Sequence, residues 1–413
     1  MNSQGISSFL NSISIRSYPS PGSTYEAGKF LLETDSSFVT APSNKGIVYG
    51  GNLYYDVFQS IGFQRILEIA TESEEVGKIN ISEDTGDFSS RDLTLNDLPA
   101  FSFENLPFRS YLTSAVAMIR YNDSWNLSFH RVQIKDGKTA SVRIVDRHLA
   151  SLIKGAEPIL VSFLIGLSPF IALTASMGFS QPGGELEMAS VLAQRTLDVV
   201  KYKKWEFAAD CEIVLCGHFN PGETAEEGPF IDLTGTIDPV RNQPVFHLDE
   251  ILTKKDAVCP AIRPASREHA FLMGEPRHIS ILRGLKAEGV KVYKSALTMG
   301  GCNWLHLILA VDYTQDIKQL GQLVFSLHTS LKKVTFVNQD INPSDPVSVE
   351  WAVATRCQPH RDIYIIENQR GSSLDPSSEN GITSKWIVNT LVNDDKMPSF
   401  QQLLPSFPGQ NLS

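Results

Sequence analysis

A strand-rich stretch in the middle of the chain, from Phe108 to about Ala265, most constrains the fold. Short runs of β-branched and aromatic residues, such as 115–121, 141–145 and 211–219, alternate there with turn residues. Runs of this length and composition are typical of β-strands. The stretch therefore predicts a barrel-like or sandwich sheet with one or two inserted helices.

The chain is long enough for more than one domain, because 413 residues exceed what a single hydrophobic core usually supports. We expect a mixed α+β and α/β multidomain protein. It divides into an α/β domain over 1–105, a barrel domain over 106–266 and an α/β domain over 291–413. A helix over 267–290 is expected to join the first domain.

Helical spacing of apolar residues marks several further segments. It predicts helices over 54–71, 185–202 and 317–330, and an amphipathic face over 277–288. Residues 159–175 are interpreted as a buried strand followed by a helix, since the apolar run is short for a membrane span. The polar, Ser-rich segment 371–384 is expected to be a mobile tail.

Composition and charge exclude several classes of protein. The net charge is −10 and the sequence pI is about 5.4, whereas a nucleic-acid surface needs a basic stripe. No secretory signal or membrane span is recognised, and the five cysteines form no CxxC pair. We therefore expect a cytoplasmic protein with reduced thiols that binds no nucleic acid.

Two carboxylates flank a Gly-Pro turn in the segment 226–232. Glu227 and Asp232 lie five residues apart in an apolar, strand-like neighbourhood. Acids placed near one another and near a cation acquire different pKa values, so that one stays ionised while the other transfers a proton. The pair suggests proton chemistry, although an acidic turn alone is more often a solvated loop.

Three polar residues could bind a metal ion. Asn126, His148 and Glu185 offer an amide oxygen, an imidazole and a carboxylate, which are suitable ligands for Mn²⁺ or Mg²⁺. Sequence spacing alone does not show that they converge, and the alternative is a set of ordinary turn residues.

The chain resembles the UbiD-like decarboxylases, a family of carboxy-lyases that use prenylated flavin mononucleotide (prFMN). The resemblance covers residues from about 110 to about 390. It rests on ordered motifs at 126–131, 175–177 with Glu185, 212–217, 227–232, 340–343 and 351–356. Cys216 and Ile231 depart from the family pattern, and Ile231 should narrow the space beside Asp232.

The resemblance implies a central split β-barrel that holds prFMN, with the flavin phosphate bridged to Mn²⁺ or Mg²⁺ and to K⁺. Asn126, His148 and Glu185 would be the metal ligands. The residues expected at the cofactor are Asn126, Ser128, Phe129, His130, Arg131, Arg147, His148, Ser176, Met177, Glu185 and Lys385. For Lys385 the alternative is an ordinary exposed lysine, and for His130 a histidine whose hydrogen bonds are all satisfied within the protein.

The resemblance also implies a catalytic set of Arg131, Glu227 and Asp232. Arg131 and Glu227 would organise the substrate carboxylate, and Asp232 would donate the proton that replaces CO₂. The expected reaction is reversible, non-oxidative decarboxylation of an α,β-unsaturated or aromatic acid. A phosphorylated acid such as anhydromevalonate phosphate is a substrate alternative.

Two other functions remain open on the sequence. The first is a flavin-binding protein without decarboxylase activity, acting as a cofactor carrier or assembly partner. The second is a metal-dependent hydrolase, which requires a metal with an open position. For the decarboxylase we expect a flavin prenyltransferase as cofactor supplier and a homodimer or higher homo-oligomer.

Overall fold

The structure is a computed structural model that describes residues 4–21, 29, 31, 36–102, 110–145, 148–155, 157–177, 183–313 and 316–401. The chain divides into two compact units, Met1–Ser280 and Ile281–Ser413. Each unit has its own hydrophobic core. The boundary predicted at residue 105, inside the first unit, stays a prediction.

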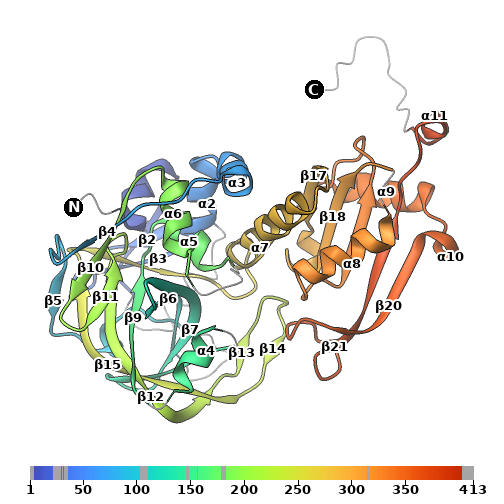
Figure 1. Cartoon of the computed structure of the whole chain (residues 1–413). Coiled ribbons are helices and arrows are strands. Elements are labelled where there is room, and N and C mark those ends of the chain that lie inside the picture. The colour runs from blue at the N-terminus through green and yellow to red at the C-terminus, as the bar shows by residue number, and fades with distance from the viewer. Residues whose placement is uncertain are drawn as a thin grey trace. The chain divides into compact units, whose positions relative to one another are not determined.

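An antiparallel barrel forms the centre of the N-terminal unit (Figure 1). Its strands are β6 (Ser110–Tyr121), β7 (Ser124–Ile134), β8 (Thr139–Val142), β9 (Ile159–Ile165), β12 (Ile213–Glu227) and β15 (Arg241–Thr253). They are ordered β12-β9-β6-β7-β8-β15, and pairing of β12 with β15 closes the sheet. Strand β5 (Ser89–Arg91) extends β15. The prediction of a β-barrel is confirmed.

Both faces of the barrel sheet are buried, as strand β6 illustrates. Successive residues of a strand face opposite sides. Ala115, Ala117 and Ile119 accordingly belong to the inner core, whereas Val116 and Met118 belong to the core outside the barrel. This explains why β6 reads as a nearly continuous apolar run.

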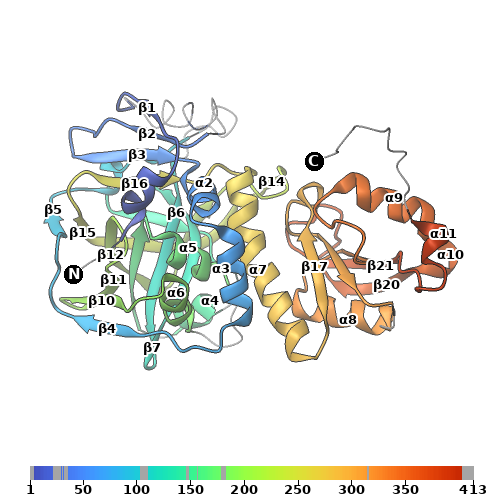
Figure 2. The same ribbon diagram turned by 90° about the horizontal axis from the view of Figure 1, so that it is seen from above.

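Helices cover the outer face of the barrel (Figures 1 and 2). They are α2 (Leu53–Ser60), α3 (Phe63–Glu72), α5 (Pro169–Ala175) and α6 (Glu185–Ala193), and all contribute to the outer core. A shorter helix, α4 (His148–Ile153), follows β8. The strand-then-helix prediction for 159–175 is confirmed by β9 and α5.

Smaller elements complete this unit. One small sheet consists of β1 (Arg16–Tyr18), β2 (Phe38–Thr40), β3 (Ile47–Gly51) and β16 (Ala257–Ala261), which lie side by side in Figure 2. Another consists of β4 (Ile79–Ser82), β10 (Leu197–Tyr202) and β11 (Trp205–Ala208). Strands β13 (Phe230–Ile231) and β14 (Ile237–Asp238) make a hairpin. Short 3-10 helices are η1 (Ile6–Ser12) and η2 (Leu95–Asp97).

Two helix predictions need correction. The helix predicted over 54–71 is broken at Gly62, whose φ of +85° interrupts the right-handed helix and separates α2 from α3. The helix predicted over 185–202 ends at Ala193, because Gln194 turns left-handed and the following residues, including Val199 and Val200, form strand β10. Helix α7 (Arg267–Ala287) matches the helix predicted over 267–290.

The C-terminal unit is a five-stranded sheet with helices on its faces. Its strands are β17 (Val292–Leu297), β18 (His306–Val311), β19 (Lys333–Val337), β20 (Ile363–Arg370) and β21 (Ile382–Asn389), in the order β17-β18-β19-β21-β20. The predicted β-α-β succession is confirmed by β18, α8 (Ile317–Leu327) and the parallel strand β19. Its other helices are η3 (Met299–Gly301), α9 (Pro346–Arg356), α10 (Pro359–Asp362) and α11 (Met397–Phe400).

The segment 371–384 folds against this sheet and is not the loose tail that its polarity predicted. Lys332 Nζ donates a hydrogen bond of 2.8 Å to Asp375 Oδ2, and Trp304 Nε1 donates one of 3.0 Å to Ser372 Oγ. Ser372 and Asp375 are both buried.

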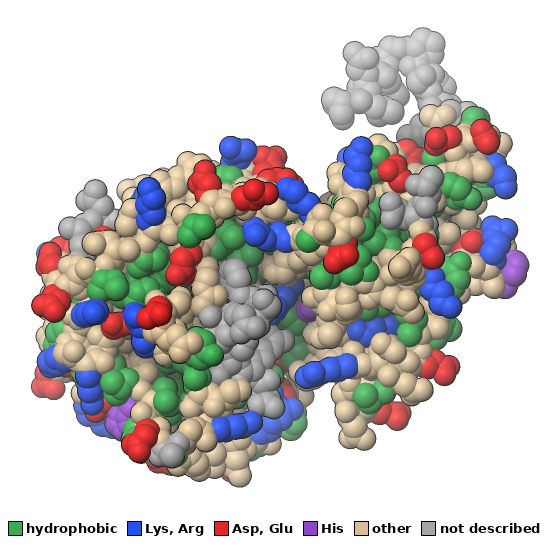
Figure 3. Space-filling view, viewed as in Figure 1, with side chains coloured by type: hydrophobic (Ala, Val, Ile, Leu, Met, Phe, Trp, Pro, Cys, Tyr) green, Lys and Arg blue, Asp and Glu red, His purple; other side chains and the backbone are tan. Residues whose placement is uncertain are grey.

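The surface carries charges of both signs. On the face shown in Figure 3, basic and acidic side chains are interspersed among the described residues and form no continuous basic stripe. Within the described part of the chain, no helix combines the length and the apolar character needed to cross a membrane.

Candidate active site

Arg131, near the end of strand β7, is the centre of a buried charge network in the N-terminal unit. Its Nε donates to Glu227 Oε1 and its Nη2 to Glu227 Oε2, each at 2.9 Å. The Glu227 side chain has no exposed surface and that of Arg131 is 9% exposed. Phe230 stacks on the guanidinium, 4.6 Å from ring centroid to Cζ. A two-point grip of this kind fixes both side chains in one orientation.

Asp232 lies at the open side of the same guanidinium. Arg131 Nη1 is 3.5 Å from Asp232 Oδ2, and the Asp232 side chain is 20% exposed. Its other oxygen, Oδ1, accepts a hydrogen bond of 2.7 Å from the backbone N–H of Leu233. The structure therefore brings Arg131, Glu227 and Asp232 together. Of these two acids, Asp232 makes the longer contact with Arg131.

Asp238, on strand β14, is a member of the network that the sequence analysis missed. Its Oδ2 accepts a hydrogen bond of 2.6 Å from Arg131 Nη2 and lies 3.6 Å from Arg143 Nε. Its Oδ1 forms an ion pair with Arg241. Burial opposes ionisation of Asp238, but the hydrogen bonds from Arg131 and Arg241 outweigh it and lower its pKa. Burial likewise opposes the charge of Arg131, but Glu227 and Asp238 raise its pKa. Arg131 and Asp238 therefore stabilise one another's charged forms.

His130 is satisfied within the protein. Its Nδ1 lies 2.9 Å from the carbonyl oxygen of Arg143, so this nitrogen carries the proton, and its Nε2 accepts a hydrogen bond of 2.8 Å from Ser128 Oγ. Burial lowers the pKa of His130 to about 4. The sequence allowed two interpretations of His130, a cofactor contact or a histidine whose hydrogen bonds are satisfied within the protein. This geometry fits the second.

Asn126 and Glu185 meet, as the metal-site prediction requires. Asn126 Nδ2 is 3.4 Å from Glu185 Oε1, and both side chains are buried. Helix α6 approaches β7 closely here, since a Cβ on Gly183 would lie 2.8 Å from Ser124 Oγ. Glu185 Oε2 is buried without a hydrogen-bond partner, and burial raises the pKa of this carboxyl to about 8. A buried carboxylate oxygen with no donor fits a bound cation.

The other proposed metal and phosphate ligands lie partly outside the described residues. Arg147 is one of them, and so is the side chain of His148, although His148 begins helix α4. Among the described side chains, no group of three or more His, Cys, Asp or Glu residues could hold a metal ion. The three-ligand site therefore stays a prediction.

The remaining proposed cofactor contacts lie around the same core. Phe129 packs against the outer core to which Met177 belongs. Ser176 ends helix α5, and its Oγ is 3.4 Å from the carbonyl oxygen of Ala172. The hydroxyl of Ser128 is bonded to His130.

Lys385 belongs to the C-terminal unit. It is 2% exposed, its Nζ donates to the carbonyl oxygen of Thr329 at 2.6 Å, and it lies over the ring of Phe325. Burial lowers its pKa to about 8. The alternative of an ordinary exposed lysine is therefore wrong. The role of Lys385 as a flavin ligand stays a prediction.

His269, in the first turn of α7, was also missed. Its Nδ1 accepts a hydrogen bond of 3.2 Å from the backbone N–H of Ala265, which leaves the proton of the neutral ring on Nε2. Burial lowers the pKa of His269, and the charges of Asp232 and Arg131 act on it in opposite directions. This imidazole is within electrostatic range of Arg131 and Asp232.

The two departures from the family pattern differ in effect. Cys216 is fully buried in the outer core, and burial raises the pKa of its thiol to about 12, so it packs as a neutral side chain. Ile231 pairs with Ile237 in the hairpin that separates Asp232 from Asp238.

Comparisons with known proteins identify the family. The family described as the 3-octaprenyl-4-hydroxybenzoate carboxy-lyase Rift-related domain matches residues 76–267, and the C-terminal domain of the same carboxy-lyase matches residues 270–390. The anhydromevalonate phosphate decarboxylase of Methanocaldococcus jannaschii is 33% identical over 335 residues, which are 78% of this chain and 79% of that protein. The enzyme of that name from Methanosarcina mazei is 33% identical over 332 residues, 78% of each chain.

A solved structure agrees with these sequence relatives. The UbiD-class enzyme HmfF from Pelotomaculum thermopropionicum, in complex with FMN, superposes with a TM-score of 0.84 at 26% identity, covering 96% of this chain and 94% of that one. The two matched domains together span most of the sequence. This chain belongs to the UbiD family of carboxy-lyases.

Proposed function

We propose that this protein is a prFMN-dependent, non-oxidative carboxy-lyase that reversibly removes CO₂ from a phosphorylated α,β-unsaturated acid such as anhydromevalonate phosphate. Family membership supports the reaction class, and the names of the archaeal relatives support the substrate class. The observation that carries the proposal is the buried pair of Arg131 and Glu227 with Asp232 at its open side.

Asn126, His148 and Glu185 would hold Mn²⁺ or Mg²⁺, with K⁺ nearby, at the phosphate of prFMN. The unpartnered oxygen of Glu185 supports a cation at this place, and Mg²⁺-like ions commonly combine a few protein oxygens with phosphate oxygens. When bound, prFMN supplies the electron sink for the charge left on carbon as CO₂ departs. Ser128, Phe129, Arg147, Ser176 and Met177 would complete the flavin environment.

Glu227 and Asp232 take different roles because they are held differently. Both oxygens of Glu227 accept hydrogen bonds from Arg131, so Glu227 keeps the guanidinium oriented. Asp232 is farther from Arg131 and partly exposed, and we assign to it the delivery of a proton to the carbon that loses CO₂. Arg131 would also position the substrate carboxylate.

The same proposal implies partners. A flavin prenyltransferase would supply the cofactor, and the chain would act as a homodimer or higher homo-oligomer. We place the enzyme in the cytoplasm, where its five free thiols would stay reduced.

The test is purification from cells that co-express a flavin prenyltransferase, with Mn²⁺ and K⁺ in the buffers. Native mass spectrometry and absorbance identify the bound cofactor, and CO₂ release is then measured with phosphorylated, unsaturated and aromatic acids. Release from the phosphorylated acid supports the proposal. Bound prFMN without release from any acid would instead support a flavin-binding protein without decarboxylase activity.

A further inference from the structure

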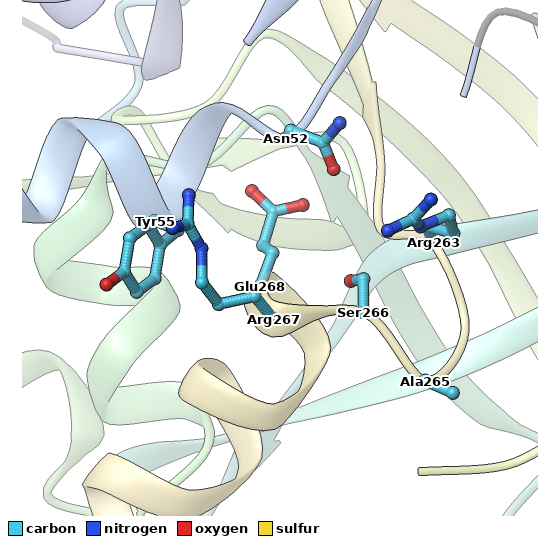
Figure 4. Close-up of a pocket in the computed structure, with 7 residues that line it drawn as sticks. All are labelled: Asn52, Tyr55, Arg263, Ala265, Ser266, Arg267 and Glu268. Carbon is cyan, nitrogen blue, oxygen red and sulfur yellow. The ribbon is translucent and has the colours of Figure 1, made fainter. Parts of the chain in front are cut away.

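A polar cavity lies in the N-terminal unit, at the start of helix α7. It has a volume of about 240 Å³ and is lined by Asn52, Tyr55, Arg263, Ser266, Arg267 and Glu268 (Figure 4). None of these residues belongs to the catalytic network or to the proposed metal site. We propose that this cavity binds the phosphate group of the substrate, an inference that rests on the proposed function.

The two arginines supply the positive charge. The Arg267 guanidinium lies over the ring of Tyr55, with Cζ 3.9 Å from the ring centroid, so the aromatic ring orients the N–H fork. Its ion pair with Asp56 has a distance of 3.5 Å, and the Arg267 side chain is half exposed. Such a pair is weak and can be exchanged for a ligand. Arginine forks match the oxygens of a phosphate group.

Glu268 is the one acid among the described lining residues, and it does not cancel this charge. Its Oε1 accepts a hydrogen bond of 2.6 Å from the backbone N–H of Tyr54, which caps helix α2. The side chain is 3% exposed, and burial raises its pKa to about 8. Burial therefore favours the neutral form of this carboxyl, which can donate its proton to an anion.

Two neutral polar side chains complete the lining. Ser266 precedes α7, and its Oγ accepts a hydrogen bond of 3.1 Å from the backbone N–H of His269, which leaves the hydroxyl proton available. Asn52 is buried and held at a φ of +56°. Figure 4 shows its amide oxygen directed toward the space between Arg263 and Glu268, and its Nδ2 donates a hydrogen bond of 3.3 Å to the carbonyl oxygen of Ser36. Charged forks with fixed neutral donors are the groups that a phosphate monoester requires.

One loop connects the cavity to the proton donor. Ala265, which also lines the cavity, has a φ of +54° and donates its N–H to His269. A Cβ on Gly235 would lie 4.0 Å from Ala265 Cβ, and Gly235 is in the turn that follows Asp232. Ala265 therefore lies between the cavity and the turn that follows Asp232.

The test compares two substrates and three variants of the holoenzyme. Arg267→Gln and Arg263→Gln should each raise KM for anhydromevalonate phosphate about 10- to 100-fold with little change in kcat, since a charged hydrogen bond to phosphate is lost. Neither should change kcat/KM for the dephosphorylated acid. The control is Arg65→Gln, an arginine of α3 whose side chain is 71% exposed.

Calorimetric titration with inorganic phosphate provides a readout that does not depend on turnover. The wild-type holoenzyme and Arg65→Gln should bind phosphate, Glu268→Gln should still bind it at pH 7, and Arg267→Gln should not. Equal losses of kcat/KM for both acids in the arginine variants, or phosphate binding unchanged by them, would overturn the phosphate site. If the wild-type enzyme does not act on the phosphorylated acid, the proposed function fails, and the titration still decides whether this cavity binds phosphate.

Discussion

Arg131 binds Glu227 through two parallel hydrogen bonds of 2.9 Å each, at a point where the Glu227 side chain has no exposed surface. Desolvated charges are stable only when they are paired, so these residues define one another's position. Glu227 thereby orients the arginine that faces Asp232.

A double-mutant cycle should measure this coupling. Arg131→Gln, Glu227→Gln and the double variant should give an interaction free energy of about 2 kcal/mol, because either single change leaves a buried charge without its partner. The measurement is chemical denaturation of the N-terminal unit. The matched control is the exposed pair Arg65 and Glu68, 3.2 Å apart, for which we expect less than about 0.5 kcal/mol. Equal coupling in both cycles would contradict the buried-pair interpretation.

Asp232→Asn should remove proton delivery and keep the fold. We expect kcat to fall about 10²- to 10⁴-fold, the range typical of a lost general acid. Substrate affinity should change little, because Arg131 keeps Glu227 and Asp238. Single-turnover CO₂ release with a melting curve checks both points. An Asp232→Asn enzyme of normal activity would remove this residue as proton donor.

His130 should make stability depend on pH. Its pKa is about 4 in the folded protein against an ordinary value of 6.5, so the unfolded chain binds more protons between these values. The stability contribution is complete above about pH 6.5 and is lost as the pH falls toward 4, on the order of 3 kcal/mol. The unfolding free energy of wild type should drop more over this interval than that of His130→Asn. Parallel curves would show that His130 is not held neutral.

Glu185→Ala should lower metal and flavin content together, because the carboxylate oxygen without a hydrogen-bond partner would no longer be available to the cation. Elemental analysis for Mn and the flavin-to-protein absorbance ratio measure both. Glu68→Gln, on the exposed surface of α3, is the control and should retain both. Full flavin and metal occupancy in Glu185→Ala would move the metal site elsewhere.

The sequence located Arg131, Glu227 and Asp232 because each lies in a short segment with a recognisable pattern. Asp238 had no such signal. It reaches Arg131 only because two-residue strands pair Phe230 with Asp238, and hairpins this short show no alternation of apolar and polar residues. His269 was missed because its relation to Asp232 comes from packing at the start of α7.

The fold was predictable where strand composition was strong, as in the barrel. The fold was not predictable where a single residue changed the direction of the backbone. Gly62 divides one apolar helical pattern into two helices, and Gln194 ends α6 although the apolar spacing continues. In segment 371–384, polar composition predicted mobility, but the buried Asp375 pairs with Lys332, which is distant in sequence.

The most direct measurement is decarboxylation of anhydromevalonate phosphate by the prFMN-loaded enzyme in D₂O. We predict one CO₂ released per product molecule and one deuterium on the carbon that carried the carboxylate, with the rate of both reduced about 10²- to 10⁴-fold in Asp232→Asn. A fully loaded wild-type enzyme that releases no CO₂ from this acid would contradict the proposed function.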